Sequence, residues 1–133
     1  MFAGRARPTV SEMADRPVGV QIQFTIGDAA VGDDIVERLL AERSIACGQR
    51  LGPVHSRFRW LEAIESATEY LYLLKTKADL SDQVCAAICA AHPYDVPEVI
   101  VLPILGGLAA YLEWIDTQTR DANLSVEETS TTK

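Results

Sequence analysis

The sequence predicts an α+β fold with the ferredoxin-like order β-α-β-β-α-β and one more helix at its C-terminal end. An alternating apolar pattern at residues 18–26 precedes a helical stripe, and a second helical stripe precedes an apolar strand at residues 98–105. Between these two units, residues 45–61 and 68–77 are both rich in strand-forming residues, with no helix between them. Two such halves joined by a hairpin place both helices on one face of an antiparallel sheet.

In the first half, residues 18–26 alternate apolar with small or polar side chains, as in a strand with one buried face. Asp28 is expected to cap the helix that follows, and this helix is expected to end near Ser44. Residues 45–61 return to an extended pattern, with a bend or bulge at Gly52-Pro53. The predicted stripe of the helix consists of Val31, Ile35, Leu39 and Leu40.

In the second half, the segment LEAIESAT at 61–68 is expected to hold the hairpin turn. Asp79 or Ser81 is expected to cap a second helix, which Pro93 ends because the residue before a proline leaves helical geometry. Continuous apolar character at 98–105 is typical of a strand covered on both faces. The helical stripe consists of Leu80, Val84, Ala87, Ile88 and Ala91, and residues 108–119 form the closing helix.

Length and composition indicate a single globular domain. The chain has 133 residues, 48% hydrophobic and 23% charged, which is enough to bury a core without disulfides or metal. We expect the folded domain at residues 18–119, a disordered N-terminal extension at 1–17, and a disordered polar tail at 120–133. Met13 is an alternative start.

Charge and cysteine content restrict the partners and the compartment. The formal net charge of −7 disfavours nucleic acid and anionic membranes, but it does not repel metal ions. No apolar run approaches the roughly 18 residues of a membrane span, and no signal peptide is visible. An odd count of three cysteines favours free thiols in a reducing cytoplasm. A bare second sheet face would promote aggregation, so we expect a homo-oligomer.

The stretch HPYDVPEVIVLPI at 92–104 closely resembles the His-Pro-Tyr-(Glu/Asp)-Val-Pro-Glu-aliphatic signature of the CutA family, the divalent-cation tolerance proteins. Three further segments resemble family motifs in the same order: ERSIAC at 42–47, FRWLEAIESATEYLYLLKT at 58–76, and YLEWI at 111–115. The resemblance implies a ferredoxin-like subunit in a tight, PII-like homotrimer whose hairpins brace neighbouring subunits. It also implies a role in tolerance of copper or other divalent metals, with no catalysed reaction.

The chain departs from the family pattern at three places. Ala63 and Ile64 stand where the family usually has glycine and lysine at the hairpin tip. Gly48-Gln49 replaces an asparagine that usually follows the Ala-Cys pair. Phe24 stands near the position of a first-strand cysteine that is a proposed copper ligand in some members, and phenylalanine cannot ligate a metal.

Two sets of candidate metal ligands follow. The resemblance pairs Cys47 with His92, a thiolate and an imidazole suited to copper or zinc. Helical spacing places Cys85, Cys89 and His92 on one side of the second helix, as a thiophilic-metal or redox patch. The alternatives are a buried thiol at Cys47, two tolerated semi-exposed cysteines, and a histidine that interacts with the helix end.

A cleft is predicted around the rigid loop that contains Pro93 and Pro97. Tyr94 and Glu98 are expected to line it, with Trp60 at a subunit interface and Lys75 as a candidate anion contact, although a solvated lysine is the default. The acidic residues of the hairpin, Glu62, Glu65 and Glu69, are expected to form a solvated tip.

Three functional hypotheses follow. The first is a cytoplasmic trimeric metal-tolerance protein that acts by binding, and the second is a trimeric PII-like signalling or scaffold module that binds a small molecule or partner protein between subunits. The third and weakest is an enzyme that uses His92, Tyr94 and Glu98 as acid and base groups. TIGDAAVGDD after the first strand lacks a phosphate-binding pattern, so nucleotide binding has no local support.

Overall fold

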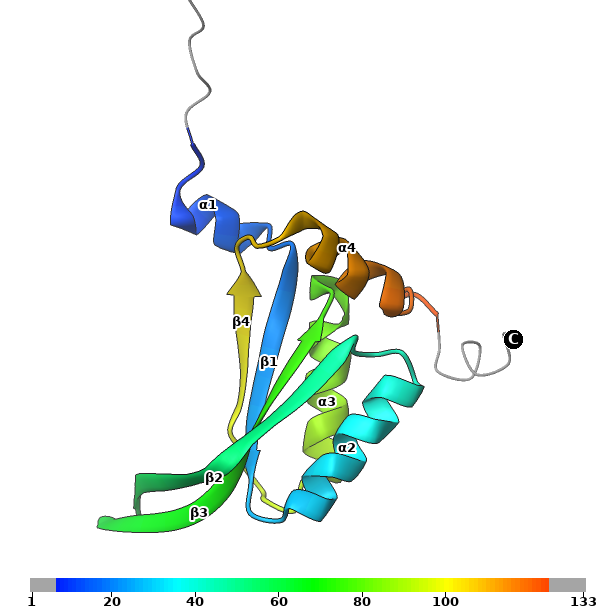
Figure 1. Ribbon diagram of the computed structural model, residues 1–133. Coiled ribbons are helices and arrows are strands. Elements are labelled where there is room, and N and C mark those ends of the chain that lie inside the picture. Colours follow the sequence, from blue (N-terminus) through cyan, green and yellow to red (C-terminus); the bar gives the residue numbers. More distant parts are fainter. Residues whose placement is uncertain (1–6, 125–133) are drawn as a thin grey trace, which may run out of the picture.

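The computed structural model describes residues 7–124, which form a four-stranded antiparallel sheet with helices packed against it (Figure 1). The strands lie in the order β2-β3-β1-β4. This arrangement confirms the predicted ferredoxin-like order. The elements are α1 Val10–Asp15, β1 Gly19–Ile26, α2 Ala29–Ala41, β2 Cys47–Trp60, β3 Ala63–Thr76, the 3-10 helix η1 Ala78–Leu80, α3 Ser81–Ala91, β4 Val99–Ile104 and α4 Ala109–Gln118.

Helices α2 and α3 cover one face of the sheet and enclose the core (Figure 1). Phe24 of β1 is fully buried and stacks on Tyr72 of β3, with ring centroids 4.8 Å apart and planes 4° from parallel. Each large apolar side chain buried in this way contributes about 1.5–3 kcal/mol. The other core residues are Val20, Ile22, Ile26, Ile35, Val36, Leu39, Ile45, Leu74, Leu80, Val84 and Ile88.

Helix α2 begins as predicted, because the carboxylate of Asp28 accepts a hydrogen bond from the Ala30 amide at 2.9 Å. Its buried stripe differs from the prediction: Leu40 is exposed, and Val36 and Gly32 are buried. A Cβ atom at Gly32 would lie 2.5 Å from ring atoms of Tyr72. The missing side chain therefore admits the tyrosine, and a pattern search for apolar residues does not detect it.

Strands β2 and β3 form a hairpin that is longer than predicted. Its turn is confined to Leu61 and Glu62, both with positive φ (46° and 63°), so β3 begins at Ala63 and not at residue 68. A register shift between Leu51 and Val54 confirms the bend expected at Gly52-Pro53. Beyond this bend the two strands pair only with each other, and they form a curved arm that projects past the sheet (Figure 1).

Helix α3 ends as predicted but begins differently. Neither Asp79 nor Ser81 caps it through a side chain. The 3-10 turn η1 leads directly into the helix, and the hydroxyl of Ser81 donates to the Ala78 carbonyl at 2.7 Å. At the other end His92 is extended (ψ 138°), as expected for a residue before proline.

Strand β4 is an edge strand, so the prediction of cover on both faces is wrong for a single chain. It pairs with β1 alone. Ile100, Val101 and Leu102 are 40%, 41% and 42% exposed. Continuous apolar character identifies a strand, but it does not show whether the chain's own elements cover both of its faces.

The described ends of the chain are more ordered than predicted. Within the N-terminal segment, Thr9 and Glu12 form a reciprocal capping box that begins α1; the T-x-x-E pattern is a known signal for this structure. Beyond residue 119, Arg120 is buried and donates to Gln83 and Leu124. Its Nε is the only buried side-chain nitrogen or oxygen in the described region without a hydrogen-bond partner. The predictions for residues 1–6 and 125–133 lie outside the described residues. No helix between residues 7 and 124 is long and apolar enough to cross a membrane.

Candidate functional site

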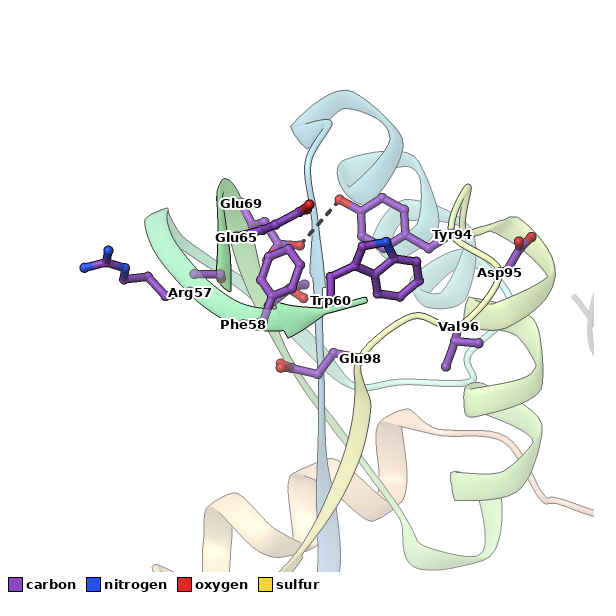
Figure 2. A pocket seen from close by; sticks show the side chains of 11 residues that line it. Arg57, Phe58, Trp60, Glu65, Glu69, Tyr94, Asp95, Val96 and Glu98 are labelled. Carbon is purple, nitrogen blue, oxygen red and sulfur yellow. Dashed lines mark hydrogen bonds between the residues drawn. The ribbon is translucent and has the colours of Figure 1, made fainter. Parts of the chain in front are cut away.

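A pocket of about 690 Å³ lies between the hairpin arm and the loop that joins α3 to β4 (Figure 2). The arm contributes the outward-facing aromatic side chains Phe58 and Trp60, and the loop contributes Tyr94 opposite them. This volume is in the usual range for small-molecule sites. The pocket is lined by Thr25, Ser56, Arg57, Phe58, Trp60, Glu65, Glu69, Tyr94, Asp95, Val96 and Glu98.

His92 fixes the start of this loop. Its side chain is buried, and Nε2 lies 2.7 Å from the carbonyl oxygen of Thr25 on β1. Nδ1 accepts a hydrogen bond from the Tyr94 amide at 3.1 Å, so Nε2 carries the proton and donates to Thr25. The ring also meets Phe24 edge-on, with centroids 6.3 Å apart. His92 therefore ties the end of α3 to the central strand and positions Tyr94.

Tyr94 links the loop to the arm. Its hydroxyl lies 3.5 Å from Oε2 of Glu69 on β3, at the long limit of a hydrogen bond. A Cβ atom at Gly27 would lie 3.2 Å from the same hydroxyl, so glycine at this position keeps space for it. Burial raises the pKa of Tyr94, and the Glu69 carboxylate raises it further. Tyr94 therefore stays a neutral donor well above physiological pH.

The pocket is acidic. Four carboxylates line it, from Glu65, Glu69, Asp95 and Glu98, against the single guanidinium of Arg57. Figure 2 shows the Arg57 guanidinium extending away from the other lining side chains. Negative potential therefore dominates the space between the arm and the loop.

The structure brings three of the four predicted cleft residues to this pocket, namely Tyr94, Glu98 and Trp60. Lys75 does not lie in it. The ammonium of Lys75 donates to Oε1 of Gln49 at 2.6 Å, and the lysine pairs with Cys47 beyond the other end of the β2 bend.

The candidate metal ligands do not come together. Within the part of the chain that the structure describes, no three histidine, cysteine, aspartate or glutamate side chains are grouped so as to hold a metal ion. Both ring nitrogens of His92 are engaged inside the chain. His92 turns inward from α3, so the predicted patch with Cys85 and Cys89 is not formed.

The three cysteines are free and lie in different surroundings. Cys89 is exposed, whereas Cys85 packs against the core, where burial raises its pKa and makes its thiolate less accessible. Cys47 is half-buried beside Tyr111 of α4; burial raises the pKa of Tyr111, and the thiol contributes. Of the three, only Cys85 packs against the core cluster.

Glu69 is the pocket residue that sequence reasoning placed wrongly. It was expected at a solvated hairpin tip, but it is only 7% exposed. The signal was the two-residue period of β3, since Glu69, Leu71 and Leu73 share the face opposite the helices. Asp95 and Phe58 carried no such signal, because the arm and the loop meet only in the folded chain.

The chain is a ferredoxin-like domain with an extended hairpin arm and a His-Pro-Tyr loop beside it. The family model of the CutA1 divalent ion tolerance protein matches residues 20–118. This chain belongs to the CutA1 family.

Relatives and solved structures agree with this assignment. The chain is 33% identical over 110 residues to the divalent-cation tolerance protein CutA of Pectobacterium atrosepticum, covering 81% of this chain and all of that protein. It is 32% identical over 102 residues to a chloroplastic CutA protein of Arabidopsis thaliana, covering 77% of this chain; the match spans little more than half, 56%, of that protein.

The fold is shared with solved CutA1 structures. The rice protein, Oryza sativa CutA1, superposes with a TM-score of 0.75 at 32% identity, covering 79% of this chain and 97% of that one. CutA1 of the psychrotrophic bacterium Shewanella sp. SIB1 gives a TM-score of 0.77 at 30% identity, covering 79% and 98%. These matches establish the ferredoxin-like fold of the domain.

Proposed function

We propose that this protein acts in tolerance of divalent cations as a cytoplasmic homotrimer that binds copper or another divalent metal ion and catalyses no reaction. The observation that carries the proposal is the family match over residues 20–118, with relatives whose names state divalent-cation tolerance. The net charge of −7 supports it, because an acidic surface attracts cations.

The exposed edge of the sheet supports self-association. Ile100, Val101 and Leu102 form a continuous apolar edge that is about two-fifths exposed on the single chain. Exposed apolar edge strands pair with other chains. In the proposed trimer, neighbouring copies cover this strand and the face opposite the helices.

The metal site belongs between copies of the chain. A tetrahedral zinc or copper site needs about four ligands, and one chain supplies no group of three among its described residues. Cys47 is the better ligand candidate, because it lies on the face opposite α2 and α3, half-buried beside Tyr111 of α4, whereas both ring nitrogens of His92 are engaged inside the fold.

Native mass spectrometry of the reduced protein with one equivalent of Cu or Zn per subunit tests this function. The expected result is a trimer that retains metal, loses it in Cys47→Ser, and keeps it in the matched control Cys85→Ser, whose thiol packs against the core. A trimer that retains neither Cu nor Zn contradicts the metal function.

A second function is favoured by a specific observation, the pocket lined by Trp60, Tyr94 and Glu98. A PII-like module that binds a small molecule there would signal by binding, independently of any metal at Cys47. The two functions can be tested independently, because the metal function depends on Cys47 and the small-molecule function depends on the pocket residues.

A further inference from the structure

The carboxylate of Glu69 is the least explained group in the pocket. Its side chain is more than nine-tenths buried, yet its one hydrogen bond is the 3.5 Å contact with Tyr94. Among the described residues it forms no ion pair. A carboxylate offers about four acceptor sites and is costly to bury unless it is paired. Glu69 therefore has acceptor capacity directed at the space between arm and loop.

Aromatic side chains surround the same space. Phe58 and Trp60 face it from the arm, and Tyr94 faces it from the loop (Figure 2). Aromatic faces attract cations and also provide apolar contact. Carboxylates beside aromatic faces are complementary to a molecule with both a positive charge and an apolar body.

A bare divalent ion is a poor occupant of this pocket. Calcium takes about six to eight oxygen ligands, and magnesium requires near-octahedral geometry. Although four carboxylates line the pocket, no three described acidic, histidine or cysteine side chains are close enough together to hold a metal. An organic ammonium needs only one or two acceptors for its charged group, and the aromatic side chains of the pocket can contact its apolar body.

We propose that this pocket binds an organic cation, a protonated amine with an apolar body, with its charge on Glu69 and Glu98 and its body against Trp60 and Tyr94. The proposal rests on the second proposed function, that the pocket takes a small molecule, and it names the chemical class of that molecule. It does not depend on the metal function.

The test uses the fluorescence of Trp60, which is 58% exposed at the pocket. The chain has two tryptophans, so the full-length Trp114→Phe protein reports Trp60 alone. Three matched probes are titrated: 2-phenylethylammonium, neutral 2-phenylethanol, and the anion 3-phenylpropionate. We expect the ammonium to bind at least about tenfold more tightly than the alcohol, since a hydrogen bond between charged groups is stronger than one to a neutral hydroxyl.

Two pocket variants and one control locate the binding. Glu69→Gln and Glu98→Gln are each expected to weaken ammonium binding at least about tenfold; Glu98 is exposed, so its variant retains the fold. Glu113→Gln, an exposed carboxylate on α4 outside the pocket, should leave binding unchanged. Circular dichroism checks that each variant is folded.

The possible outcomes distinguish a failure of the organic-cation proposal from a failure of the second proposed function, small-molecule binding in the pocket. Equal binding of the ammonium and the alcohol, or unchanged binding in both pocket variants, overturns the cation class but leaves a small-molecule pocket. No saturable response to any probe up to about 10 mM overturns the proposal and removes the support that the pocket gives to the second function. The metal titration above is unaffected by either result.

Discussion

The two faces of the sheet are made from the same strands but differ in what covers them. Under the helices, Ile22, Phe24 and Leu74 are fully buried and form a closed core. On the other face, Gln21, Gln23 and the half-buried leucines of β3 lie beside the exposed edge strand β4. One face is enclosed by α2 and α3, and the other is only partly covered within the chain. Cys47 belongs to the second face, and the candidate pocket lies between the projecting arm and the loop that joins α3 to β4.

The largest expected effect contrasts an isoleucine of each face. Ile22→Ala should destabilise the protein by about 2–5 kcal/mol, because it opens a cavity in the closed core. If the outer face stayed bare in solution, Ile100→Ala at 40% exposure would change stability by about 0.5 kcal/mol or less. The proposed trimer predicts a larger loss for Ile100→Ala, and it predicts that the stability of both the parent and the variant falls as the protein is diluted. Denaturant unfolding at several protein concentrations measures both variants.

The next effect concerns the link between core and loop. His92→Ala should destabilise the fold by about 1–3 kcal/mol, since it leaves the buried Thr25 carbonyl without its donor. It should also raise the mobility of Tyr94, measured by amide hydrogen exchange over residues 93–98. The control is His55→Ala, which changes the other histidine of the chain, exposed on the arm. Equal effects of the two substitutions would contradict the structural role of His92.

A third prediction concerns pH. Burial raises the pKa of Tyr72 to about 12, and its hydrogen bond to Asp33 raises it as well. An unfolded tyrosine titrates near about 10. The folded state therefore holds this proton more tightly, so the stabilisation is complete below about pH 10 and is lost as the pH rises toward 12.

An absorbance titration at alkaline pH follows the ionisation of the four tyrosines of the chain. Tyr72 should ionise last, and Tyr72→Phe should remove that step and flatten the fall in stability between about pH 10 and pH 12. An unchanged last step in Tyr72→Phe would show that another tyrosine is the most protected.

The smallest expected effect concerns Lys75, which pairs with Cys47 and does not line the pocket. Lys75→Met removes one hydrogen bond to Gln49 at a half-buried site and should cost about 0.5–1.5 kcal/mol. Because Lys75 does not line the pocket, binding of 2-phenylethylammonium should not change. Altered binding in this variant, measured by Trp60 fluorescence, would extend the site beyond the arm and the loop.

The sequence predicted the covered face better than the open one. Strand and helix periods identify residues such as Phe24 and Ile88, because burial within one chain imposes a regular apolar spacing. Gly32 was missed because a glycine that admits Tyr72 has no apolar signal. The helix caps were predicted where the capping residue was local, as at Asp28, and failed where a 3-10 turn replaced the cap.

The site was only partly predictable for a physical reason. Tyr94 and Glu98 belong to one short motif, so their proximity could be read from the chain. Glu69 and Phe58 reach them through the curvature of the arm, which depends on the bend between Leu51 and Val54. The partners of His92 could not be predicted, because the sequence does not reveal that both of its ring nitrogens are engaged within the fold.

The central claim is that copies of this chain cover the face opposite the helices. Sedimentation velocity of the reduced protein over a dilution series to about micromolar concentration tests it most directly, with circular dichroism on the same samples. The account predicts a trimer that dissociates only as it unfolds. A folded monomer that persists at micromolar concentration, with native circular dichroism, would contradict it.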